Sequence, residues 1–121
     1  MGLTFNWGNI VQNILASLPL SNVEHIYFCH TKGASVFSIP RLIYDGRRTL
    51  WRSIDTIVLY DIDFATEPFA CNEIVKALGR RQKRGMAVRR ITVQQCPGAH
   101  QVHTLAFQSV ARDVVEWDGR N

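Results

Sequence analysis

The stretch Val88-Arg-Arg-Ile91-Thr-Val93-Gln-Gln-Cys96 carries the pattern that decides the fold. Apolar side chains occupy its first, fourth and sixth positions, and a cysteine occupies its ninth. Residues 23–28 and 54–59 have apolar side chains at the same first, fourth and sixth positions, and residues 115–117 form a shorter copy. A pattern that recurs along a chain predicts one structural unit that is used several times.

Each copy has the length and composition of a strand, and helical periodicity occurs between the copies. We expect strands near residues 23–29, 54–60, 88–94 and 114–117. Apolar side chains three and four residues apart predict helices at 5–18, which Pro19 ends, and near 69–84 and 99–111. In the last helix we expect one buried face, made of Val102, Leu105, Ala106 and Val110. At this length, residues 1–121 are expected to form a single domain.

Alternating strands and helices predict an α/β fold with a parallel sheet. A cysteine after the third apolar position is typical of leucine-rich repeats. One strand with one helix cannot bury both apolar faces, whereas stacked copies share a continuous core. We therefore expect a short solenoid of strand–helix units that is leucine-rich-repeat-like, or ribonuclease-inhibitor-like. The spacing between copies is irregular, so an ordinary βαβ domain remains the alternative.

The C-terminal part of the chain resembles the leucine-rich repeats of fungal F-box proteins, especially those of mushroom-forming fungi. The similarity covers about residues 54–119, and it comprises a basic helix end, a glycine-containing turn, a strand ending in Cys96 and a closing Trp117-Asp118-Gly119. The resemblance implies the substrate-recognition segment of an SCF-type ubiquitin ligase receptor. The F-box is not recognisable, so a Skp-type adaptor is an expected partner only where an F-box precedes this segment.

Composition places the chain among folded proteins of an intracellular compartment. Apolar residues make up 46% of the chain and charged residues 20%. No apolar run approaches the roughly 20 residues that a membrane-spanning helix needs, so we expect no membrane association. Three cysteines cannot all pair and show no disulfide framework, which indicates a reducing environment, cytoplasmic or nuclear.

Common catalytic signatures are absent from the sequence. It contains no phosphate-binding or dinucleotide-binding loop and no serine-hydrolase or zinc-protease motif. We therefore expect no enzyme, no catalytic residue and no cofactor. Side chains that suit zinc occur at Cys29, His30, Cys96, His100 and His103. Cys29 is seventh in its strand pattern and Cys96 is ninth, so the two should not lie side by side, and we expect no metal site.

Two acidic pairs also invite a chemical interpretation. Asp61 and Asp63 could bind a divalent cation, and Glu116 with Asp118 could act as acid and base. Acids at a strand end more often face solvent or cap a turn, which is what we expect here.

The expected binding site is the face of the sheet that points away from the core. Side chains alternate along a strand, so positions three, five and seven of each copy should point outward. Outward positions comprise His25, Tyr27 and Cys29, then Thr56, Val58 and Tyr60, and finally Arg90, Thr92 and Gln94. Stacking should place Tyr27 near Val58 and Thr92, and Tyr60 next to Gln94. We expect a protein target of unspecified identity on this face.

The alternative function is nucleic-acid binding by the basic stretch 76–90. Lysine and arginine can neutralise phosphates, and the patch would be centred on Arg80, Arg81, Lys83 and Arg84. No aromatic side chains are interleaved for base stacking. Cations at a solvated helix C-terminus also oppose the helix dipole, which explains the stretch without a ligand. We therefore favour protein recognition.

Overall fold

The computed structural model describes residues 2–6, 24–44 and 53–119. These residues form an α/β structure around a parallel sheet with the strand order β1-β2-β3-β4-β5. The strands are β1 (Gly2–Asn6), β2 (His25–Thr31), β3 (Thr56–Ile62), β4 (Arg90–Gln94) and β5 (Val114–Trp117). The helices are η2 (Gly33–Phe37), α2 (Ser38–Ile43), α3 (Pro68–Lys83) and α4 (Gln101–Gln108).

The parallel sheet agrees with the expectation from the sequence, although β2, β3 and β4 each begin two residues later than expected. The expectation of a helix over 5–18 is wrong at its start, because residues 5 and 6 belong to β1. Phe5 pairs with Phe28 in the parallel ladder, and this long-range pairing overrides the helical periodicity. Residues 7–18 of the expected helix, and residue 23, lie outside the described residues.

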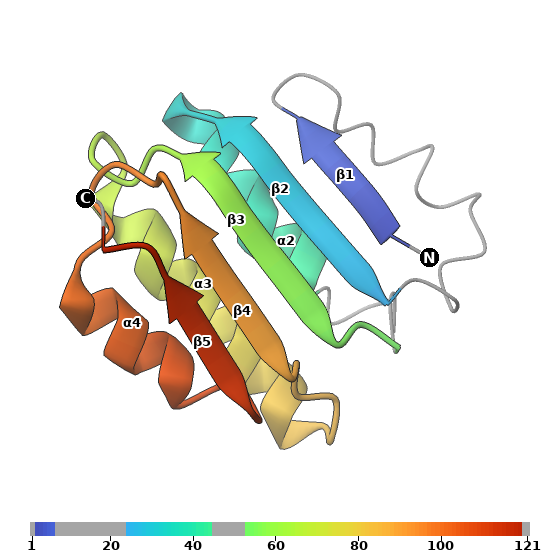
Figure 1. Ribbon diagram of the computed structural model, residues 1–121. Coiled ribbons are helices and arrows are strands. Elements are labelled where there is room, and N and C mark those ends of the chain that lie inside the picture. Colours follow the sequence, from blue (N-terminus) through green and yellow to red (C-terminus); the bar gives the residue numbers. More distant parts are fainter. Residues whose placement is uncertain (1, 7–23, 45–52, 120–121) are drawn as a thin grey trace.

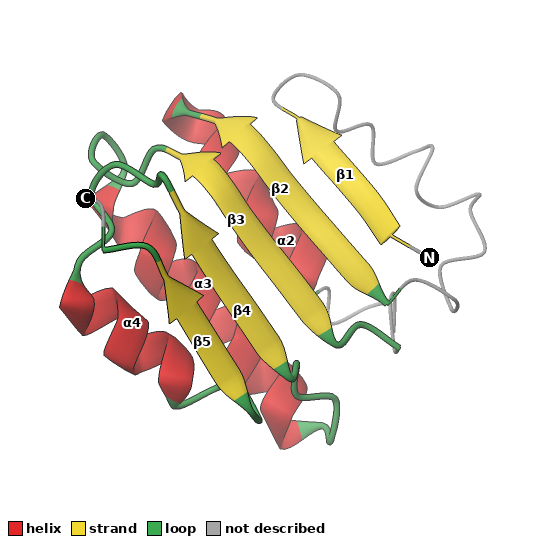
Figure 2. Cartoon of the chain, in the orientation of Figure 1, coloured by secondary structure: helices red, strands yellow, loops and turns green. Residues whose placement is uncertain are grey.

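In the described ranges α2, α3 and α4 lie on one side of the sheet, and α2 and α3 pass behind the strands in Figure 1 and Figure 2. The strands follow one another in chain order, so each crossover moves the chain one place along the sheet. The core lies between the sheet and the helices, where Ile74 and Leu78 of α3 are buried. The opposite face of the sheet carries no described helix.

Apolar side chains of successive strands stack in register. One row joins Ile26, Ile57, Ile91 and Val115, and the next joins Phe28, Leu59, Val93 and Trp117. The fourth and sixth pattern positions of the first three copies are buried. Alternation of side chains along each strand therefore sends the same pattern positions into one continuous core.

The same change of backbone direction occurs at the carboxyl end of each strand from β2 to β5, within the last two residues of β2 and β3 and just after β4 and β5. His30, Asp61, Gln95 and Gly119 each stand five residues after the first residue of their strand, and all four have φ between 51° and 79°. Positive φ is uncommon for residues other than glycine. Its recurrence at one register position indicates that the chain leaves the sheet by one repeated geometry.

Helix α4 differs from the expected helix over 99–111 both in length and in its buried face. Val102 and Leu105, expected in the core, are 65% and 57% exposed. Phe107 is buried in their place, whereas Val110 is buried as expected and Ala106 is half-buried. The helix is rotated because Phe107 is the bulkiest apolar side chain available to fill the space against the neighbouring elements. No helix in the described ranges is long and apolar enough to cross a membrane.

Candidate protein-binding face

The open face is the side of the sheet on which no described helix lies, and it is made of side chains from β2 to β5. Its members are His25, Tyr27, Cys29, Thr56, Val58, Tyr60, Arg90, Thr92, Gln94, Val114 and Glu116. Register places them in three rows across the strands. The sequence-predicted binding residues are thus brought together on one surface.

The central row contains Tyr27, Val58, Thr92 and Glu116 in successive strands. Tyr27 is 38% exposed, whereas the smaller Thr92 is only 8% exposed. The expected proximity of Tyr27, Val58 and Thr92 is confirmed by this register. An aromatic ring beside apolar and hydroxyl groups offers area together with directed hydrogen bonds, as binding surfaces require.

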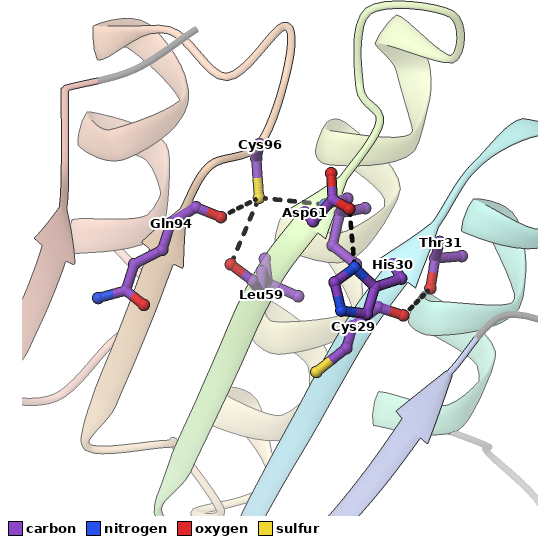
Figure 3. Close-up of polar contacts among 8 residues, drawn as sticks. Cys29, His30, Thr31, Leu59, Asp61, Gln94 and Cys96 are labelled. Atoms are coloured by element: carbon purple, nitrogen blue, oxygen red, sulfur yellow. Dashed lines mark hydrogen bonds and ion pairs between the residues drawn. The ribbon is translucent and has the colours of Figure 1, made fainter.

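The row at the carboxyl end contains Cys29, Tyr60 and Gln94, so the expected neighbours Tyr60 and Gln94 are confirmed. His30 extends this end of the face, because its left-handed backbone turns the imidazole toward Asp61 and Tyr60. Nδ1 of His30 lies 2.8 Å from Oδ2 of Asp61 (Figure 3). The His30 ring also meets the Tyr60 ring edge-on, at 5.5 Å between centroids. These contacts fix the orientation of the His30 side chain at the carboxyl end of the open face.

The row at the amino end contains His25, Thr56, Arg90 and Val114. Charged groups surround this row. Nδ1 of His25 lies 3.9 Å from Oδ1 of Asp55, and Nε of Arg90 lies 3.9 Å from Oε1 of Glu116. This end of the face is therefore the polar end, whereas Tyr27 and Val58 make its centre aromatic and apolar.

The zinc-suited side chains are not gathered in one place. Sγ of Cys96 lies within 3.5 Å of backbone atoms of Leu59, Ile62 and Gln94, so Cys96 is held against the sheet. Figure 3 shows the Cys29 side chain apart from Cys96, on the open face. The N–H of His100 donates to Nδ1 of His103, which caps α4. Within the described residues no group of three or more histidine, cysteine or acidic side chains could hold a metal ion.

One acid of each pair, Asp63 and Asp118, accepts hydrogen bonds from backbone N–H groups. Oδ1 of Asp63 accepts hydrogen bonds from the N–H groups of Ala65 and Thr66, so it caps the turn before α3. Oδ2 of Asp118 accepts from the N–H of Gln95 at 2.7 Å, at the point where the chain leaves β4. Glu116 instead faces Arg90, so Glu116 and Asp118 have different partners.

The basic stretch does not form the expected four-residue patch. Arg81 is 1% exposed, and its Nη1 donates to the carbonyl oxygen of Ile43 at 3.4 Å. It follows Ile74, Ala77 and Leu78 at helical spacing, so it falls on the buried face of α3. Arg80, Lys83 and Arg84 are exposed, and the Arg84 guanidinium lies over the Tyr44 ring.

Sequence reasoning did not assign several residues to the open face or its amino end: Asp55, Arg89, Asp113, Val114 and Glu116. The signal for two of them was available, because the alternation rule applied to 114–117 would also assign Val114 and Glu116 outward. Asp55, Arg89 and Asp113 precede their strands, and only the strand order brings them together.

No protein-family model, curated protein or solved structure matches the chain.

Proposed function

We propose that this protein is a recognition scaffold that binds a protein partner on the open face of its sheet. The observation that carries the proposal is the one-sided architecture: helices cover one face, while the other presents aligned rows of aromatic, polar and charged side chains from four strands. A flat surface of this composition suits a macromolecule better than a small ligand, which needs a concave pocket.

Three features support a leucine-rich-repeat-like organisation of the units. The strands follow in chain order, their apolar rows are in register, and a left-handed backbone residue recurs at the carboxyl end of each strand from β2 to β5. Cys96, which follows β4, adds hydrogen bonds to the backbone of β3 and of Gln94 at the end of β4. Repeats of this kind stack into extended surfaces that bind partners.

The resemblance to fungal F-box proteins makes a ubiquitin-ligase substrate receptor the specific form of this proposal. The resemblance concerns the repeat segment, which in such receptors holds the target. Recruitment of a Skp-type adaptor would depend on an F-box and is not proposed for residues 1–121 themselves.

The distribution of the basic residues makes nucleic-acid binding the weaker alternative. Lys76 pairs with Glu73, Arg81 is buried, and Arg89 donates to Asp113. Arg80 lies on the helical side, whereas Arg90 lies on the open face. A continuous basic surface, which phosphate binding needs, is therefore divided.

The test is a triple substitution, Tyr27→Ala, Tyr60→Ala and Arg90→Ala, because tyrosine and arginine often dominate binding energy. The purified variant should lose capture of any protein that the wild-type chain enriches from a cell extract, with nearly unchanged melting temperature. A matched control, Phe69→Ala, Arg80→Ala and Leu105→Ala, removes exposed side chains of the helical side and should keep capture.

Capture retained by the first variant would move the binding site away from the open face. Loss of folding in that variant would show that these side chains belong to the core. DNA or RNA binding that falls steeply with salt, and that Arg80→Gln weakens, would favour the alternative function.

A further inference from the structure

A small groove crosses the amino ends of β3, β4 and β5, beside the open face. Its cavity volume is about 280 Å³. The groove is lined by Asp55, Thr56, Arg89, Arg90, Asp113 and Val114.

The two arginines of the groove are held differently. Nε of Arg89 donates to Oδ2 of Asp113 at 2.9 Å, which anchors that guanidinium. Nε of Arg90 lies 3.9 Å from Oε1 of Glu116, a distance at which the charges attract without a hydrogen bond. More than half of the Arg90 side chain is exposed. Arg90 is therefore the cation of the groove that can take up a new partner.

We propose that this groove binds a carboxylate side chain of a partner peptide, with the Arg90 guanidinium as its main contact. This inference rests on the proposed function, and it names the chemistry that the open face recognises at its amino end. Guanidinium and carboxylate can form two parallel hydrogen bonds, which Glu116 does not form with Arg90 in the unbound chain. The exposed Val114 side chain supplies an apolar wall beside them.

The walls of the groove favour a carboxylate over a phosphate. Asp55 and Asp113 both line it, and two carboxylates repel a doubly charged phosphate more strongly than a singly charged carboxylate. None of its lining residues is aromatic, so the groove offers no platform for a nucleic-acid base. The two arginines balance the two aspartates, so a peptide that places one carboxylate against Arg90 suits the groove better than a phosphate or a nucleic acid.

The test uses a phage-displayed library of random twelve-residue peptides, selected on the full chain. Enriched peptides should share an Asp or Glu at one position. In a synthetic peptide, replacing that acid by its amide should weaken binding to the wild-type chain about tenfold. Arg90→Gln should weaken binding of the parent peptide to a similar extent, and the two changes together should cost little more than either alone.

Two variants control the experiment. Arg80→Gln removes the same charge from the helical side and should change affinity less than about twofold, because exposed charges at a distance are screened. Arg90→Lys keeps the charge but loses the planar fork, so it should weaken binding by an intermediate factor. If Arg90→Gln fails to fold, Arg90→Lys and the amide peptide still test the contact.

The outcomes separate this inference from the proposed function. Peptides whose binding needs Tyr27 but not Arg90 would overturn the carboxylate site and leave the scaffold intact. No selectable peptide and no captured protein would overturn both. Tighter binding when phosphoserine replaces the acid, or competition by a single-stranded oligonucleotide, would overturn the choice of a carboxylate.

Discussion

Sγ of Cys96 lies 3.5 Å from the backbone nitrogen of Ile62, whose N–H donates to the sulfur. The same sulfur lies 3.3 Å from the carbonyl oxygens of Leu59 and Gln94 (Figure 3). Cys96 is 1% exposed, so water cannot replace it as a partner for the backbone. One side chain thus joins the end of β3 to the turn that follows β4.

Cys96→Ala should therefore destabilise the protein by about 2–3 kcal/mol, because it leaves a buried N–H without its acceptor and opens a small cavity. Cys71→Ala, at another buried cysteine, is the matched control and should cost about 1 kcal/mol through lost packing. Urea unfolding of both variants measures the difference. Equal losses would show that the sulfur contacts contribute nothing beyond burial.

Gly98 has a φ of +83° and lies against the backbone of the preceding unit. A Cβ at this position would come within 2.4 Å of the Ala65 nitrogen and 2.6 Å of the Phe64 carbonyl carbon. Gly98→Ala should therefore cost at least about 3 kcal/mol, since both the clash and the left-handed backbone oppose it.

Gly85→Ala separates these two causes. Gly85 has a similar φ of +73°, but a Cβ there would meet nothing within 4 Å. Its substitution should cost only about 1–2 kcal/mol, from the backbone alone. Thermal unfolding of the two variants compares them, and a cost for Gly98→Ala no larger than that for Gly85→Ala would contradict the close approach.

Arg81 should behave as a core residue and Arg80 as a surface residue. Arg81→Ala removes a buried side chain and its hydrogen bond to the Ile43 carbonyl, so it should cost about 3 kcal/mol. Arg80→Ala should change the free energy of unfolding by less than about 0.5 kcal/mol. Chemical denaturation of each variant measures the effect, and similar values for the two would place Arg81 at the surface.

The buried thiols predict a loss of stability at alkaline pH. Burial, with a smaller contribution from Cys96, raises the pKa of Cys71 from 9.0 to about 12, and burial raises the pKa of Cys96 from 9.0 to about 11. Above pH 9 the folded chain keeps protons that the unfolded chain releases. The stabilising effect of the two buried, protonated thiols is complete below pH 9 and is lost as the pH rises toward 11 for Cys96 and 12 for Cys71. Over this range each thiol lowers the free energy of unfolding by about 1.4 kcal/mol per pH unit.

Denaturation midpoints between pH 8 and pH 10.5 measure this slope. Tyrosine and lysine side chains titrate in the same range, so the comparison is with Cys71→Ala, which retains them. The variant should lose stability less steeply than the wild type by about 1.4 kcal/mol per pH unit. Identical slopes would mean that the Cys71 thiol ionises as readily in the folded chain as in the unfolded one.

Much of the fold follows from the spacing of apolar residues. Positions four and six of the copies point into the core, as Ile57 and Leu59 do, because side chains alternate along an extended backbone. The rule also predicts the neighbours Tyr27, Val58 and Thr92, since copies of one unit pair in register. Local sequence therefore suffices for β2 to β5 and for most of the open face.

Contacts between distant segments decided the rest. Residues 5 and 6 form a strand because β2 offers a ladder of hydrogen-bonding groups, which outweighs the weak helical preference of a short segment. The rotation of α4 depends on the space that remains for Phe107. Neither the available ladder nor the available space is a property of the local sequence.

The sequence by itself determined the parallel order of strand–helix units and the outward direction of residues such as Tyr27 and Arg90. Both follow from the spacing of apolar side chains, which repeats every two residues in a strand and about every three and a half residues in a helix. Only the tertiary structure decided that Arg81 is buried while Arg80 is exposed, and that Asp55, Arg89 and Asp113 meet in one groove. Burial of a charge depends on an acceptor such as the Ile43 carbonyl, and a groove depends on which strands are neighbours. Both are set by packing between segments far apart in the chain.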